Sequence, residues 1–145
     1  MPQFGDSPSV SEIIEGMTQK RGALVTRLRD HTLALEDVEE RTLFDHFCRE
    51  WTPAYYVRRT QLFHVHDFQR GLRATMFVGV KTLEPVMAES PGISAHNHRL
   101  VAETPAPGNT KSLRVPIGSH EDVDGFMELV RVKWTVARGR PARTP

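Results

Sequence analysis

Apolar residues at the start of the chain recur three or four positions apart, a spacing typical of an amphipathic helix. They are Val10, Ile13, Ile14, Met17, Leu24, Val25 and Leu28. Ser9 and Glu12 have the spacing of a helix-capping box. Gly16 and Gly22 each weaken a helix by roughly 1 kcal/mol relative to alanine. Two shorter helices that meet near residues 17–18 therefore fit the pattern as well as one long helix.

The middle of the chain changes to the alternation typical of a β-sheet. Extended segments are predicted at 55–57, 62–65 and 72–80. In the last of these, one face carries Leu72, Ala74 and Met76 and the other carries Arg73, Thr75 and Phe77. The turn Gln69-Arg70-Gly71 is predicted to join the last two segments into an antiparallel hairpin, because glycine supplies the positive φ that such a turn needs.

The segment from Val38 to Trp51 fits two structures. Its large apolar side chains have helical spacing and are Leu43, Phe44, Phe47, Cys48 and Trp51. Residues 42–48 are also short enough to be one strand, and periodicity alone does not choose between the two.

Helical and extended segments follow one another in the last third of the chain. Thr82 is placed to cap a short helix, a second helix is predicted over 94–103, and residues 112–117 alternate as a strand. Ser119 and Asp122 then cap a closing helix. Its apolar stripe comprises Val123, Phe126, Met127, Val130 and Trp134.

These segments predict an α+β fold with an N-terminal helical region, an antiparallel sheet of about four or five strands and C-terminal helices packed on one face. The length of 145 residues suits one domain, which we place at residues 1–138. Residues 139–145, rich in arginine and proline, are expected to form a flexible basic tail.

Composition narrows the classes of function. Residues 1–6 carry neither a basic head nor an apolar signal core, and no window is apolar enough to cross a bilayer, so we expect a cytoplasmic protein. Lys and Arg number 19 against 18 Asp and Glu, so the overall charge gives no reason to bind nucleic acid. The single cysteine, Cys48, excludes an internal disulfide and a thiolate cage, and we expect it to be a small buried hydrophobe.

A pair of histidines could bind a metal. His64 and His66 are two residues apart on a predicted strand, so both imidazoles leave the same face and could share one divalent cation. A third ligand would come from elsewhere, with His46, His96 or His98 as candidates. The alternative is that the pair only lines the sheet or bonds neighbouring strands.

Basic and aromatic side chains gather on or beside the predicted sheet. Guanidinium groups next to aromatic rings suit a phosphate or carboxylate ligand, because the planar fork donates two hydrogen bonds and also stacks. The candidate ligand-binding residues are Tyr55, Arg58, Arg59, His64, Arg73 and Lys81. The alternative is a solvated outer sheet face whose charges discourage aggregation.

The sequence lacks the usual signatures of nucleophilic catalysis. It has no Gly-x-Ser-x-Gly elbow and no His-Glu-x-x-His, and Gly79-Val80-Lys81-Thr82 lacks the earlier glycine of a phosphate-binding loop. No cofactor is predicted, and the sequence leaves open whether the protein is an enzyme.

Two stretches of the chain carry a resemblance to a known family. They are Leu62-Phe63-His64-Val65-His66-Asp67-Phe68 through Phe77-Val78-Gly79-Val80-Lys81, and Ser112-Leu113-Arg114-Val115-Pro116-Ile117 through Asp122-Val123 to Leu129-Val130-Arg131-Val132-Lys133. They resemble the strand, turn and strand, and then the strand and closing helix, of small bacterial proteins of unknown function near the YdhG-like α+β group. The resemblance implies helices on one face of an antiparallel sheet and a strand at 42–48. It implies no reaction and no catalytic residues.

Three functions are therefore weighed. The first, which we favour, is a binding module for a small anionic ligand or a peptide on the sheet. The second is a homodimer that packs through Val123, Phe126, Val130 and Trp134 of the closing helix. The third is a metal-dependent enzyme that uses His64 and His66.

Overall fold

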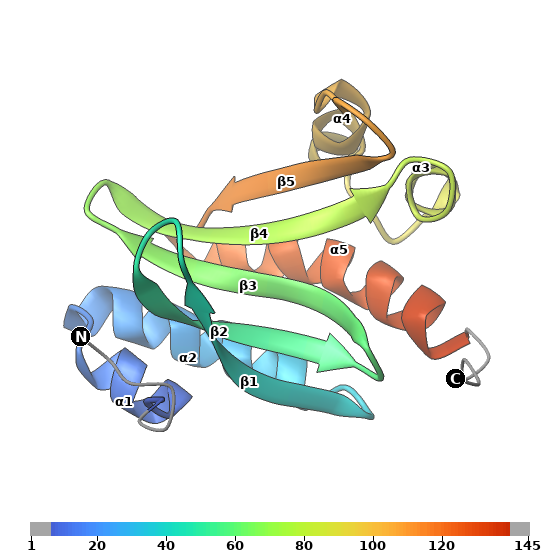
Figure 1. Ribbon diagram of the computed structural model, residues 1–145. Coiled ribbons are helices and arrows are strands. Elements are labelled where there is room, and N and C mark those ends of the chain that lie inside the picture. The colour runs from blue at the N-terminus through green and yellow to red at the C-terminus, as the bar shows by residue number, and fades with distance from the viewer. Residues whose placement is uncertain (1–6, 140–145) are drawn as a thin grey trace.

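Five antiparallel strands form one sheet in the order in which they occur along the chain (Figure 1). The computed structural model describes residues 7–139. The strands are β1 (Val38–Asp45), β2 (Glu50–Val57), β3 (Thr60–Phe68), β4 (Gly71–Gly79) and β5 (Thr110–Pro116). Tight turns connect the first four strands, whereas residues 80–109 lead from β4 to β5. The predicted antiparallel sheet is confirmed.

Five helices accompany the sheet in the described part of the chain. They are α1 (Val10–Glu15), α2 (Gln19–Leu33), α3 (Glu84–Glu89), α4 (Ala95–Glu103) and α5 (His120–Gly139). α2 and α5 contact each other and cover the same face of the sheet, which we call the inner face (Figure 1). The opposite face, the outer face, carries no helix from residues 7–139. The predicted α+β fold is therefore confirmed.

Apolar side chains of the inner face fill the space between the sheet and the helices. Leu72, Ala74 and Met76 of β4 alternate onto this face as predicted, and none is more than 3% exposed. Phe63 of β3 meets Phe126 of α5 edge to face, with 5.1 Å between the ring centroids. Each fully buried side chain of this size stabilises the fold by about 1.5–3 kcal/mol, so the core between sheet and helices is the main source of stability.

Side-chain caps set the start of the N-terminal helices. Ser9 Oγ accepts the N–H of Glu12 at 3.1 Å, and Glu12 Oε1 accepts the N–H of Ser9 at 3.2 Å, which completes the predicted capping box. Thr18 caps α2 by accepting the N–H of Arg21 at 3.2 Å. The N-terminal region is therefore two helices that meet near residues 17–18.

Two later helix starts differ in how well the sequence predicts them. Ser119 Oγ accepts the N–H of Asp122 at 3.1 Å, so α5 is capped as predicted. The prediction that Thr82 caps α3 is wrong, because Pro85, three residues on, has no N–H to donate. Leu83 is the N-cap of α3 and forms no side-chain hydrogen bond there.

The segment from Val38 to Trp51, whose pattern fits either a helix or a strand, contains β1, a turn and the start of β2. β1 pairs with β2 from Val38–Val57 to Asp45–Glu50. The strand predicted over 42–48 is thus correct as far as Asp45, and residues 46–49 form the turn that follows. Cys48 is half-buried. The expectation of a buried hydrophobe is wrong, because the turn carries this residue out of the core.

A β-bulge interrupts the pairing of β2 with β3. Tyr55 pairs with Phe63, but the next pairing involves Gln61, which leaves Leu62 without a partner. The extra residue lets Leu62 and Phe63 both face the core, where each is 0% exposed. Gln61 then lies beside His64 on the outer face, where His64 Nδ1 is 2.7 Å from the side-chain oxygen of Gln61.

β2 leaves β3 before the β1–β2 hairpin ends. Its pairing with β3 runs only from Ala54 to Val57, so residues 50–53 pair with β1 alone. In Figure 1 the tip of this hairpin rises in front of β3. The tip is therefore held in place by side chains rather than by the sheet's backbone ladder.

No helix among residues 7–139 is long and apolar enough to span a membrane. The described residues build one hydrophobic core. Apart from Gly139, the last residue of α5, the predicted basic tail lies outside the described residues.

Candidate functional site

Polar and aromatic side chains of β3 and β4 line the outer face. His64, His66 and Phe68 alternate along β3, and Arg73 and Thr75 lie on the neighbouring strand, paired with His66 and His64 respectively. The ring centroids of the two histidines are 4.9 Å apart. The prediction that they leave the same face is confirmed.

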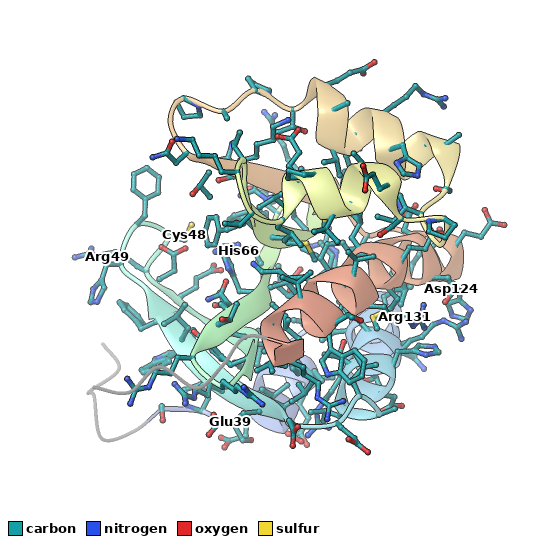
Figure 2. The ribbon with its side chains drawn as sticks, turned by 90° about the vertical axis from the view of Figure 1, so that its right-hand side faces the viewer. Glu39, Cys48, Arg49, His66, Asp124 and Arg131 are labelled. Carbon is teal, nitrogen blue, oxygen red and sulfur yellow. The ribbon has the colours of Figure 1, made fainter. Side chains whose placement is uncertain are left out.

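Asp45, the last residue of β1, fastens the hairpin turn to this face. Its Oδ1 accepts the N–H groups of Phe47 at 2.8 Å and Cys48 at 3.1 Å, which shapes the turn. Its Oδ2 accepts a hydrogen bond from Nε2 of His66 at 2.7 Å. Figure 2 shows Cys48 next to His66, on the side of the sheet away from α5. The turn covers part of the outer face, and His66 is only 3% exposed.

These contacts determine the charges around the turn. The hydrogen bond from His66, followed by that from the N–H of Cys48, lowers the pKa of Asp45 to about 2. Burial, together with the charges of Asp45 and Glu50, raises the pKa of the Cys48 thiol. Burial and the neighbouring His66 lower the pKa of His64 to about 4. At neutral pH the turn holds a carboxylate and a protonated thiol, beside a neutral His64.

Arg73 is a cation without an anionic partner in the described part of the chain. Its guanidinium carbon lies 4.6 Å from the centroid of the Phe68 ring, and the same ring stacks on His66 at 4.8 Å. Within residues 7–139 the guanidinium forms no ion pair, and its Nε is buried without a hydrogen-bond partner. Among the described residues, the side chain that packs on this guanidinium is therefore an aromatic ring.

Two further buried polar atoms near Arg73 lack partners. They are Nδ1 of His66 and Oγ1 of Thr75, in residues that are 3% and 5% exposed. A buried polar group without a partner costs about 1–3 kcal/mol, and folded proteins keep few of them. Three of the four such atoms among residues 7–139 therefore lie at neighbouring positions of β3 and β4 on the outer face, and the fourth is Nε1 of Trp51 on β2.

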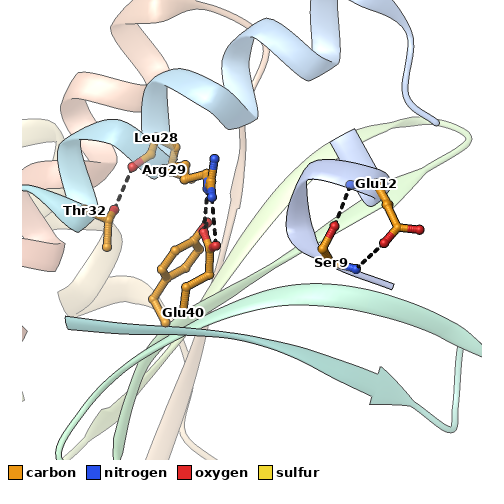
Figure 3. Close-up of polar contacts among 7 residues, drawn as sticks. Ser9, Glu12, Leu28, Arg29, Thr32 and Glu40 are labelled. Atoms are coloured by element: carbon orange, nitrogen blue, oxygen red, sulfur yellow. Dashed lines mark hydrogen bonds and ion pairs between the residues drawn. The ribbon is translucent and has the colours of Figure 1, made fainter. Parts of the chain in front are cut away.

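Tyr55, one of the predicted ligand-binding residues, does not belong to this face. Its hydroxyl donates to Oε2 of Glu40 at 2.9 Å on the inner face, and Tyr55 is 1% exposed. The same carboxylate binds Arg29 of α2 at 2.7 and 3.0 Å (Figure 3). The predicted grouping of Tyr55 with His64 and Arg73 is therefore wrong, because the strand register places it on the opposite side of the sheet.

Three other predicted ligand-binding residues lie at the far end of the sheet from Arg73. Arg58 and Arg59 form the turn between β2 and β3, and Lys81 follows β4; all three are exposed. Arg73 lies near the start of β4, so the length of that strand separates it from these cations. The structure does not bring them into one site.

The additional metal ligands predicted for the histidine pair do not join it. His96 and His98 lie on α4, where Nε2 of His98 is 3.2 Å from the carbonyl oxygen of Ser90. His46 lies in the hairpin turn and packs its ring against Phe44 at 4.9 Å.

A different set of ligand atoms comes together at the hairpin turn. A carboxylate oxygen of Asp45, the sulfur of Cys48 and a ring nitrogen of His66 all lie within 4.8 Å of one another. The sequence analysis missed Asp45 and Cys48. The only local signal is the Asp-x-x-Cys spacing across a turn, which gives no indication that a histidine from β3 completes the group.

The apolar stripe of α5 belongs to the core of this chain. Val123, Phe126 and Val130 are at most 1% exposed, and Nε1 of Trp134 donates to the carbonyl oxygen of Glu36 at 2.8 Å. The prediction that this stripe forms a dimer interface is wrong, because the same side chains pack against the sheet.

Two hollows lie away from the outer face. One of about 220 Å³ lies between the end of β4 and α5, next to Lys133. Another of about 350 Å³ lies between α1 and β2, next to Trp51. Neither is lined by Arg73 or His66, so a ligand at these two residues would lie on the outer face under the hairpin turn.

Models of known protein families, curated proteins and solved structures were compared with the chain, and none of them matches it. The resemblance to the YdhG-like group therefore stays a prediction, and the proposals for function depend on the residues of the outer face.

Proposed function

We propose that the protein is a binding module that holds a small anionic ligand on the outer face of its sheet, with Arg73 as the anion-binding residue. The observation that supports this is the unpaired guanidinium beside the unpaired atoms of His66 and Thr75. A partly buried cation without a counter-charge is costly. A carboxylate or phosphate would offset that cost through two parallel charge-assisted hydrogen bonds.

The side chains around Arg73 suit a ligand that also has an aromatic or apolar part. Phe68 stacks with the guanidinium. Further along the same face, Phe77 packs against His64 with 5.7 Å between the ring centroids and is 41% exposed. Covering such surface gains about 25 cal/mol per Å². The ligand class that fits best is an aromatic carboxylate or a phosphate ester of an aromatic group.

The hairpin turn controls access to the unpaired atoms. Nε of Arg73, Nδ1 of His66 and Oγ1 of Thr75 are shielded from solvent, so a ligand reaches them when the turn moves aside. The turn is fastened by the hydrogen bond from His66 to Asp45, while residues 50–53 have no backbone pairing with β3. A segment of this kind opens locally at a lower free-energy cost than a strand paired on both sides.

A binding screen tests the proposal. The tag-free protein is titrated calorimetrically with phosphate, aryl phosphates, nucleotides, and aliphatic and aromatic carboxylates, in the presence of a chelator so that metals play no part. We expect an aromatic anion to bind, and Arg73→Gln to weaken that binding at least tenfold, because a hydrogen-bonded charge pair contributes about 1.5–3 kcal/mol.

The matched control is Arg59→Gln, which removes an exposed arginine at the other end of the same sheet. We expect this variant to bind like the wild type. Absence of binding across the panel, or equal affinity in the Arg73→Gln variant, would exclude Arg73 as an anion-binding residue.

Self-association is the second candidate function, because one large aromatic side chain is almost fully open to solvent. Phe47, at the tip of the β1–β2 hairpin, is 97% exposed. Together with Leu43 and Phe77 it gives the outer face an apolar surface that a second copy of the chain would cover. We expect light scattering to give a dimer mass that Phe47→Ser reduces to that of a monomer. A monomer at all concentrations of the wild type would exclude this function.

A further inference from the structure

We propose that Asp45, Cys48 and His66 form a zinc-binding site at the base of the β1–β2 hairpin turn. A carboxylate oxygen, the cysteine sulfur and an imidazole nitrogen lie within 4.8 Å of one another. Ligands of a tetrahedral zinc ion lie roughly 3–4 Å apart, as follows from metal–ligand distances of about 2.0–2.3 Å. Small side-chain shifts are therefore enough to place all three around one ion.

The fold orients each of the three ligands. Oδ1 of Asp45 is occupied by two backbone N–H groups of the turn, which leaves Oδ2 facing His66. Cys48 lies three residues further on in the same turn. His66 is held on β3, which β2 separates from β1 in the sheet, by its stacking on Phe68. The ligands thus come from two segments, and a bound ion would cross-link the hairpin tip to the sheet.

A second observation concerns which nitrogen of His66 carries the ring proton. His66 is 3% exposed, yet its Nδ1 has no hydrogen-bond partner within residues 7–139, while Nε2 is directed at Asp45. The unpartnered Nδ1 can therefore carry the ring proton, which leaves Nε2 unprotonated on the side that faces Asp45.

The donor set favours zinc over the hard cations. Sulfur and imidazole nitrogen suit Zn²⁺ and its spectroscopic substitute Co²⁺, whereas Mg²⁺ and Ca²⁺ prefer oxygen ligands alone. When the metal–sulfur bond forms, the thiol proton of Cys48 is released to solvent, and the proton on Nε2 of His66 moves to Nδ1 so that Nε2 binds the metal. The Asp45 carboxylate and the Cys48 thiolate then balance the two positive charges of the ion.

This site does not depend on the anion-binding function. It uses the side of His66 that faces the hairpin turn, and its test requires no organic anion. Three protein ligands leave a fourth position for water or another ligand, which is the arrangement found in catalytic rather than structural zinc sites.

Cobalt titration of the tag-free full chain, followed by zinc competition, tests the proposal. We expect Co²⁺ to produce a near-ultraviolet thiolate-to-cobalt charge-transfer band in the wild type, and one equivalent of Zn²⁺ to abolish it. Cys48→Ala should lack the band. In calorimetry, each of three variants should weaken zinc binding at least tenfold: Cys48→Ala, His66→Gln and Asp45→Asn. Loss of a residue that only hydrogen-bonds a metal ligand already weakens metal binding about 10–100-fold, and loss of the ligand itself should weaken it at least as much.

His98→Gln is the matched control, because His98 lies on α4 outside the ligand group. It should bind zinc like the wild type. The cobalt spectrum of the wild type needs no variant, so the test stands even if a substitution unfolds the hairpin. Absence of the thiolate band, or zinc binding that Cys48→Ala leaves unchanged, overturns the proposal. Loss of zinc binding in His64→Gln together with retention in Cys48→Ala would instead restore the His64–His66 pair.

Discussion

The two faces of the sheet differ in whether their buried polar groups have hydrogen-bond partners. On the inner face, Tyr55 donates to Glu40 and Glu40 binds Arg29, so a buried hydroxyl and two charges satisfy one another. On the outer face, Arg73 and Thr75 keep buried polar atoms without partners. Folded chains rarely depart from local hydrogen-bonding rules, and where they do the departure tends to mark a functional region. The contrast places the satisfied polar groups on the inner face and is consistent with our proposal that the outer face binds a ligand.

The largest expected difference between the faces is in apolar packing. Phe126→Ala should lower the free energy of unfolding by about 3–5 kcal/mol, because a buried ring leaves a cavity. Phe126 is 1% exposed. Phe77→Ala, on the outer face, removes a ring that is 41% exposed and should cost less than about 1 kcal/mol. Chemical denaturation of both variants measures the difference, and equal losses would show that the outer face is packed as the core is.

Two adjacent glutamates give a second comparison of the faces. Glu40→Ala should cost about 1–3 kcal/mol, because it leaves Arg29 and the Tyr55 hydroxyl without their shared acceptor. Glu39 points to the outer face, where it pairs with Arg41 and both side chains are more than half exposed, at 58% and 54%. Glu39→Ala should therefore cost only about 0–1 kcal/mol. Thermal melting of the two variants is the measurement, and a Glu39 effect as large as that of Glu40 contradicts the comparison.

The smallest expected changes in the free energy of unfolding concern two buried threonines, and these changes have opposite signs. Oγ1 of Thr32 donates to the carbonyl oxygen of Leu28 at 2.7 Å, as Figure 3 shows, whereas Oγ1 of Thr75 has no partner. Thr32→Val should destabilise the fold by about 1 kcal/mol, and Thr75→Val should stabilise it by up to about 1 kcal/mol. Denaturant midpoints decide the signs. A destabilised Thr75→Val variant would mean that its hydroxyl has a partner in solution.

Local features of the fold could be predicted from the sequence, because their signals lie within a few residues. The capping box at Ser9 and Glu12, the break between the first two helices and the two faces of β4 are all of this kind. Thr82 shows the limit of such signals. Its spacing resembles a cap, but the proline that follows lacks the N–H that a cap requires.

The candidate site could be predicted only in part, because it depends on register and on contacts between distant residues. Alternation places His64, His66 and Arg73 on one face. Whether Tyr55 joins them depends on its pairing with Phe63 and on the bulge that follows, and no local pattern specifies either. The contact of Asp45 with His66 requires β2 to pair with β3 only from Ala54 onward, and the sequence carries no marker for that position.

The order of the strands has a consequence for how the chain folds. From β1 to β4 each strand pairs with the one just before it, so the loops that must close are a few residues long and cost little chain entropy. Only β5 joins across residues 80–109. A chain rich in such short-range pairings has a low contact order, which favours rapid folding. The β1–β4 meander can therefore nucleate the protein, with β5 and α5 docking onto it later.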